Sequence, residues 1–283
     1  MSDILIYTDS AADLPLKYAQ DNNVTIIPFY ITFDGSTYYK EGVELNDADF
    51  FDKISQGITP KTSCPSVEDY TNAFQKGIDD GKKIVCICLS SKLSGSYQSA
   101  LIAAEEFNDG EQRVFVIDSQ LATGSQGLLV KEAVKMSDDG FDGKAIFDKM
   151  NEIKETGIVD FIIDDLVYLQ KGGRIGKVSS LLGTLLNIKP VIVVKDGELF
   201  PLNKIRGRKK AAAYIKSLIK DIYAEHGDDY VYGVLNFEAA GDDDGFTDAL
   251  EGVDMDVFPI GCTIGSHVGP SAAGVVYIKK YNK

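Results

Sequence analysis

The stretch KIVCICLSSKLSGSYQSALIAAEEF (83–107) decides the fold, because its pattern is that of a strand, a polar turn and a helix in succession. KIVCICL (83–89) is almost continuously apolar, as is typical of a strand that is covered on both faces. Two similar apolar runs occur at ILIY (4–7) and RVFVI (113–117). Short buried strands that alternate with helices predict a parallel sheet with helices on both faces.

Two further segments complete the first half of the chain. VTIIPFYITF (24–33) is another β-rich run, and SVEDYTNAFQKGI (66–78) is a predicted amphipathic helix. Ser66 and Asp69 have the spacing of a capping box, directly after Pro65, so the helix is predicted to begin there.

The second half changes character near Gly157. Residues 190–200 predict a β-hairpin that turns at Asp196-Gly197. A basic helix over 207–223 and several strands follow it, and the apolar run VSSLLGTLLNI (178–188) is a candidate helix. We therefore predict an α/β domain over residues 1–156 and a smaller α+β domain over residues 157–283.

Composition excludes several classes of function. The chain has 29 Lys+Arg and 43 Asp+Glu among 283 residues, a formal net charge of −14. Such an acidic surface argues against nucleic-acid binding, which requires a basic face. The richest apolar stretch, at 180–194, is broken by polar residues, so no membrane-spanning helix is predicted. The start of the chain lacks a basic region before its apolar residues, which predicts a cytoplasmic protein without a signal peptide.

Polar residues follow three of the predicted strands. They are Thr8-Asp9-Ser10, the turn 90–96 and Asp118-Ser119. Ligands of parallel sheets bind beyond the carboxyl ends of the strands. Hydroxyl groups at the start of a helix, such as those of Ser94 and Ser96, suit an anionic oxygen. The competing interpretation is that these serines only cap helices.

A second group of hydroxyls lies at Thr62-Ser63 in PKTSCPS (60–66), between two prolines that hold the chain extended. Only two histidines occur. His226 is interpreted as the end of a helix, and His267 lies among small residues in TIGSHVGPSAAG. His267 fits either a hydrogen-bond donor to a ligand or a base for a nucleophilic Ser94 or Thr62. No G-x-S-x-G elbow supports the second interpretation.

Motifs for other chemistry do not occur in the chain. There is no P-loop, no G-x-G-x-x-G and no metal-ligand spacing, so neither a nucleotide cofactor nor a metal is predicted. The run KIRGRKK (204–210) is unusual in so acidic a protein. It is either a solvated helix start or a docking patch for an anionic group or an acidic partner.

Taken together, the motifs resemble those of the DegV family of bacterial fatty-acid-binding proteins. They are TDS (8–10), TSCPS (62–66), SSKLSGSYQSA (90–100), DS (118–119), LQKGGRI (169–175), IKP (188–190), the basic run from Arg206, and HVGPSAAG (267–274). They follow one another in the family's order along nearly the whole chain.

The resemblance implies two α/β domains that bury a long-chain fatty acid such as palmitate or oleate in a tunnel. It places the carboxylate on Thr62 and Ser94, with His267 near it, and we expect His267 to donate a further hydrogen bond to the carboxylate. Ser63, Gly95 and Arg174, which lie in the same motifs, are secondary candidates. It ties Arg206 to the acyl phosphate and to a kinase partner, so the protein is expected to be a non-enzymatic carrier.

The alternative is a serine-type hydrolase or acyltransferase that uses Ser94 or Thr62 with His267. The apolar segment 178–188 is the candidate for part of the tunnel wall or its lid.

Overall fold

Four parallel strands form the predicted sheet, in the computed structural model that describes residues 3–164, 166–182, 187–237 and 244–283. Their order across the sheet is β2 (Thr25–Ile27), β1 (Ile4–Asp9), β6 (Lys83–Cys88) and β7 (Val114–Asp118). All three strand pairs are parallel. The prediction from the apolar runs is therefore confirmed.

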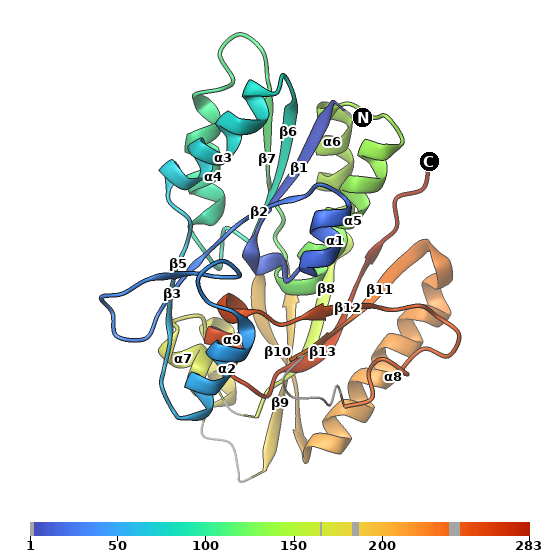
Figure 1. The fold of residues 1–283 in the computed structure, drawn as a ribbon. Helices are drawn as coiled ribbons and strands as arrows, with labels where there is room; N and C mark the ends of the chain where they lie inside the picture. The colour runs from blue at the N-terminus through green and yellow to red at the C-terminus, as the bar shows by residue number, and fades with distance from the viewer. Residues whose placement is uncertain (1–2, 165, 183–186, 238–243) are drawn as a thin grey trace.

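Helices cover both faces of this parallel sheet (Figure 1). One face packs against α3 (Val67–Asp79) and α4 (Ser96–Glu105), and the buried Cys86 and Cys88 lie in that layer. The other face packs against α5 (Thr123–Asp138) and α6 (Gly143–Ile153). The capping box of α3 is present, because Ser66 and Asp69 each accept a hydrogen bond from the other's backbone N–H.

The second half of the chain forms a mixed sheet of six strands. Their order is β10 (Glu198–Arg206), β9 (Ile188–Lys195), β8 (Ile158–Ile162), β13 (Ala273–Lys279), β11 (Tyr230–Asn236) and β12 (Asp256–Pro259). Only β11 and β12 pair in parallel among these strands. Strands β9 and β10 are the predicted hairpin, and α8 (Arg208–His226) covers the sheet (Figure 1).

The β-rich composition of residues 24–33 suggested a single strand, but the structure divides this run between two sheets. Pro28 lacks a backbone N–H, and β2 ends just before it at Ile27. The chain then enters a separate antiparallel sheet with the order β4 (Tyr39–Lys40), β3 (Tyr30–Thr32) and β5 (Lys61–Ser63). This small sheet is the element that carries the predicted hydroxyl pair Thr62-Ser63.

The segment 178–188 is not a regular α-helix in its described part. Residues Gly176–Leu181 form a 3-10 helix, and Ile188 already begins β9. Residues 183–186 lie outside the described residues.

The remaining elements are short and lie beside these sheets. The α-helices are α1 (Leu16–Asp21), α2 (Asp47–Ser55), α7 (Val167–Lys171) and α9 (Cys262–Val268). Three further 3-10 turns lie at Ser10–Ala12, Lys154–Thr156 and Gly227–Asp229. No helix within the described ranges is both long and apolar enough to span a bilayer.

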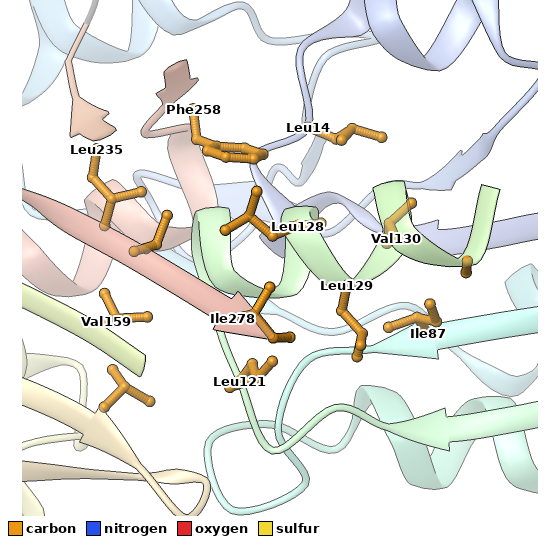
Figure 2. Close-up of a cluster of buried hydrophobic side chains, with 14 of the residues drawn as sticks. Leu14, Ile87, Leu121, Leu128, Leu129, Val130, Val159, Leu235, Phe258 and Ile278 are labelled. Atoms are coloured by element: carbon orange, nitrogen blue, oxygen red, sulfur yellow. The ribbon is translucent and has the colours of Figure 1, made fainter. Parts of the chain in front are cut away.

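Helix α5 lies between the two large sheets and joins their cores. Most of its residues are buried, and it contacts β1 of the parallel sheet as well as β11 and β13 of the mixed sheet. Figure 2 shows Leu128 of α5 on the side of Phe258 and Leu129 on the side of Ile87. One hydrophobic cluster thus contains residues from both halves of the chain. The division at residue 156 stays a prediction, although each large sheet takes its strands from one side of it.

Candidate ligand-binding site

A cavity of about 300 Å³ lies where the two halves of the chain meet. Strands β8, β9, β10 and β11 contribute apolar side chains to its wall, and the segment 260–272 closes another side. The apolar lining residues are Phe29, Leu89, Leu93, Ala122, Val159, Phe161, Leu169, Val194, Leu199, Leu235, Ile260, Ile264, Val268 and Ala272. A wall of this composition accepts a hydrocarbon and offers it almost no hydrogen bonds.

The polar part of the lining brings two predicted residues into direct contact. Thr62 Oγ1 lies 2.9 Å from His267 Nε2, although 205 residues separate them in sequence. Thr62 is held on β5 by its pairing with Ile31 on β3, and His267 is carried by α9. The expectation of an extended chain between the two prolines is met, because Thr62 is the central residue of β5.

His267 is a neutral imidazole at physiological pH. Burial, together with the positive charge of Arg174, lowers its pKa to about 4. Its Nδ1 atom is buried and has no hydrogen-bond partner within the described residues. That atom faces the backbone of Gly172, where an added Cβ would lie 2.2 Å from Nδ1. Only glycine fits at position 172, which explains part of the GGRI motif that spacing alone left without a role.

Ser94 and Gly95 line the same cavity from the turn between β6 and α4. The Ser94 hydroxyl oxygen accepts a hydrogen bond from the backbone N–H of Ser96 at 3.2 Å, so its own proton is available to a ligand. A Cβ on Gly95 would lie 3.5 Å from Cys64 Sγ, which places this turn against the loop that bears Thr62. Ser63 also belongs to the lining.

Arg174 supplies a positive charge to this end of the cavity. Its Nε donates to the backbone carbonyl of Leu93 at 3.0 Å, and its Nη1 donates to that of Gly172 at 2.8 Å. The guanidinium has five N–H donors, so others remain for a ligand oxygen. A neighbouring surface groove of about 350 Å³ shares Ser94, Gly95 and Arg174 with the cavity and adds Lys92, Lys177 and Glu198. Glu198 Oε2 lies 2.8 Å from Lys177 Nζ and 3.8 Å from Lys92 Nζ, so it partly neutralises the cations at this rim.

A family model described as an uncharacterised protein of the DegV family matches residues 3–280. The chain belongs to the DegV family. A DegV domain-containing protein of Caldanaerobacter subterraneus subsp. tengcongensis is 32% identical over 290 aligned positions. That alignment covers 99% of this chain and 100% of the relative.

Solved DegV structures share the whole fold. A stearic-acid-binding protein from Eubacterium ventriosum has 32% identity and a TM-score of 0.89, with 99% of each chain covered. A DegV family protein from Thermus thermophilus, described by its fatty acid binding, has 30% identity and a TM-score of 0.86. That match covers 99% of this chain and 100% of the other. The family and fold class predicted from the motifs are confirmed.

Not every DegV motif reaches the cavity. Thr8, Asp9 and Ser10 do not line it, and neither do Asp118 and Ser119. Among the described residues of 178–188, none belongs to the lining, and Val178 and Leu181 are buried in the core instead. The described part of this segment is therefore not in the cavity wall, and its role as a lid stays a prediction.

Arg206 also lies away from the other candidates. It is the exposed last residue of β10, paired with Ile188, whereas Leu199 of the same strand lines the cavity. Seven residues of extended chain separate the two positions by roughly 23 Å. Arg206 is thus not part of the cavity lining.

Other basic and acidic residues that the sequence singled out have structural partners. Arg208 donates to Asp244 Oδ2 at 2.6 Å and lies 3.3 Å from Asp164 Oδ1, so neither Arg208 nor Asp244 is a freely solvated charge. Asp242 and Asp243 lie outside the described residues. His226 ends α8 as expected and stacks on Tyr230, with the ring centroids 4.3 Å apart.

One cluster has the side-chain types of a metal site. Glu41, Asp47 and Cys262 place one ligand atom each within 4.8 Å of one another. The Glu41 oxygens already accept hydrogen bonds from Ser10 and Thr263, which accounts for their burial without an ion. We therefore assign no metal to this cluster.

Proposed function

We propose that the protein binds one long-chain fatty acid and acts as its carrier. The tail fills the apolar cavity, and the carboxylate lies at the end marked by Thr62, Ser94 and Arg174. The observation that carries this proposal is the Thr62–His267 pair, 2.9 Å apart, on the lining of an otherwise apolar cavity. DegV relatives of the same fold are described as binding stearic acid and fatty acids, which supports the same ligand class here.

Hydrogen-bond polarity assigns a role to each polar residue. A carboxylate only accepts, so Thr62 and Ser94 must donate their hydroxyl protons to it. Thr62 is then an acceptor toward neutral His267, which donates from Nε2. The expectation that His267 donates directly to the carboxylate changes accordingly. In our proposal His267 orients the Thr62 hydroxyl, and Arg174 adds positive charge.

The apolar tail and the carboxylate contribute differently to the free energy of binding. Burying the roughly fourteen methylenes of palmitate contributes about 11 kcal/mol before the cost of association. Each hydrogen bond to the charged head group contributes about 1.5–3 kcal/mol. The tail therefore supplies most of the affinity, and the hydroxyls fix where the carboxylate stops.

A hydrolase that uses Thr62 and His267 is the competing function, because a hydroxyl next to an imidazole is also a nucleophile–base pair. Two observations disfavour it. The lowered pKa makes His267 a weak base, and no described group accepts from or donates to its Nδ1 to orient it. Turnover of long-chain acyl esters that disappears in His267→Ala would support the hydrolase instead.

The first test is native mass spectrometry of freshly purified protein, with extraction of the bound molecule. We expect a mass excess of a few hundred daltons that extracts as free fatty acid. Thr62→Val and Ser94→Ala should lower palmitate affinity without unfolding the protein, whereas Ser179→Ala, which removes an exposed hydroxyl outside the lining, is the control. A protein that binds neither palmitate nor oleate contradicts the proposal.

The carrier role requires a partner that acts on the carboxylate, and we propose an ATP-dependent acyl kinase. The exposed basic residues Lys204, Arg206, Lys209 and Lys210 support a docking surface for an acidic protein, separate from the cavity. Arg206→Glu should abolish capture of such a kinase and leave palmitate binding unchanged. Arg208 is unsuitable for this test because it is engaged with Asp244 and Asp164. Capture that survives Arg206→Glu combined with Lys209→Glu contradicts this role.

A further inference from the structure

The TDS motif (8–10) lies at the carboxyl end of β1, directly behind the cavity rather than on its lining. Asp9 is completely buried, with 0% of its surface exposed, and Ser10 is half-buried. The proposed function gives neither residue a role. Their hydrogen bonds nevertheless lead to the two segments that carry the head-group residues.

Asp9 fixes the turn that carries Ser94. Its Oδ2 accepts from the backbone N–H of Leu89 at 2.9 Å and from the Ser96 hydroxyl at 2.6 Å. Leu89 and Ser96 are the residues immediately before and after the turn 90–95. Ser96 in turn donates its backbone N–H to Ser94 Oγ at 3.2 Å. One buried carboxylate therefore holds both ends of this turn.

A second buried carboxylate fixes the helix that carries His267. Glu41 Oε1 accepts from the backbone N–H of Thr263 at 2.8 Å, and Oε2 accepts from the Thr263 hydroxyl at 2.6 Å. Thr263 is in the first turn of α9, four residues before His267, so the two lie on the same face of the helix. Ser10 donates to Glu41 Oε2 at 2.5 Å and joins this acid to the TDS motif.

Burying the carboxyl groups of Asp9 and Glu41 is unfavourable for the stability of the fold. Burial raises the pKa of Asp9 and of Glu41, which means that the folded protein disfavours their charged forms. Even a buried ion pair can often be replaced by packed apolar side chains at no loss of stability. What apolar side chains cannot do is hold several backbone and hydroxyl donors in one fixed geometry.

We propose that Asp9 and Glu41 are positioning residues for the head-group site, one for each of its two arms. Asp9 sets Ser94 through the turn 90–95, and Glu41 sets His267, and through it Thr62, by anchoring α9. Neither acid touches the ligand. This inference rests on the proposed function, since it names what aims the residues that hold the carboxylate.

Double-mutant cycles of palmitate affinity test this pairing. Asp9→Asn should weaken binding about tenfold in the wild type and less than about twofold in Ser94→Ala, while its effect persists in Thr62→Val. Glu41→Gln should show the opposite pattern, with its effect lost in Thr62→Val and kept in Ser94→Ala. Equal coupling of either acid to both hydroxyls, or additive effects in all four cycles, would overturn the proposal.

The variants are chosen so that the fold survives. Asp9→Asn keeps the shape of the side chain. Gln126 Nε2, which donates to Asp9 Oδ1, holds the carbonyl oxygen of the new amide at that position, so the NH2 group replaces the acceptor of Leu89 and Ser96. Thermal unfolding of each variant checks this. If Asp9→Asn fails to fold, Ser96→Ala removes one hydrogen bond to Asp9 and takes its place in the cycles. If Glu41→Gln fails to fold, Ser10→Ala removes one hydrogen bond to Glu41 and takes its place.

A measurement without ligand separates this inference from the proposed function. The chain has two histidines, so ¹⁵N-labelled imidazoles give two assignable sets of signals. Glu41→Gln should shift the His267 ring nitrogens, whereas Asp9→Asn should leave them in place. If wild-type protein binds no fatty acid, the proposed function fails while this result still decides the Glu41 arm. An unchanged His267 signal in Glu41→Gln contradicts the proposed anchoring.

Discussion

The two ends of the cavity are built from different kinds of chain. The polar end comes from turns and short elements, namely β5, α9 and the turn before α4, and its side chains make specific hydrogen bonds. The apolar wall adds five residues from four strands of the mixed sheet, namely Val159, Phe161, Val194, Leu199 and Leu235. In the proposed function, the polar end fixes the position of the carboxylate and the apolar wall supplies most of the affinity.

Chain length should have the largest effect, because the wall supplies affinity in proportion to the area it buries. Palmitate has six more methylenes than decanoate, which predicts about 5 kcal/mol, or more than a thousandfold tighter binding. Competition against a fluorescent fatty acid measures both ligands. Similar affinities for the two acids would show that the wall contributes little and that the head group dominates.

Asp160, a buried residue behind the apolar wall, should make the stability of the protein depend on pH. It lies on β8 between the lining residues Val159 and Phe161, is 3% exposed, and receives one long hydrogen bond of 3.5 Å from the Tyr277 hydroxyl. Burial raises its pKa to about 7. The protonated form is favoured in the folded state, so stability is present below pH 4 and is lost as the pH rises to 7.

The size of that loss follows from the pKa difference. At 1.36 kcal/mol per pH unit, wild-type protein should lose up to about 4 kcal/mol relative to Asp160→Asn between pH 4 and pH 8. Urea unfolding at several pH values measures it. Because Asp160 is not a lining residue, palmitate affinity should not change. Parallel stability curves for the two proteins would contradict the prediction.

His267 should respond to pH in the opposite direction. Its pKa is about 4 in the folded protein, below its ordinary value of 6.5. The unfolded chain therefore takes up a proton first, and stability is lost as the pH falls from 7 toward 4. The loss should reach about 3 kcal/mol relative to His267→Asn. If acid destabilises both proteins equally in this range, the imidazole is not buried in its neutral form.

Replacing the carboxylate should have the smallest effect. Hexadecanol keeps the chain of palmitate and loses the charged head group, so we expect binding weaker by about 1.5–3 kcal/mol. In the double variant Thr62→Val, Ser94→Ala, the difference between the two ligands should shrink toward the contribution of Arg174. An undiminished preference for palmitate in that variant would move the head-group site away from the two hydroxyls.

The same contrast between the two ends explains what the sequence revealed. The polar end was predictable because hydroxyls, prolines and glycines recur in short motifs, and Thr62, Ser94, His267 and Arg174 all line one cavity. Motif order did not indicate which residues stand behind the cavity, so the TDS segment was expected at the ligand. Whether the TDS residues line the cavity or lie behind it depends on the direction that the chain takes after β1.

The wall was not predictable. Val159, Val194 and Leu235 are ordinary apolar strand residues, and nothing in their sequence separates a cavity wall from a packed core. The division of 24–33 between two sheets followed from Pro28, a signal that was present but outweighed by the β-rich composition. Arg206 belongs to a basic run that motif comparison tied to the head group, whereas the length of β10 removes it from the cavity.

Helix α5 has a consequence for how a ligand exchanges. Because it contacts strands of both large sheets, the two halves of the chain cannot separate like the jaws of a clamp without breaking the shared core. For the proposed fatty-acid ligand, entry and exit would then proceed by local opening of the cavity rim. Release is expected to be slow compared with diffusion, and a partner that loosens this rim would control the residence time of the cargo.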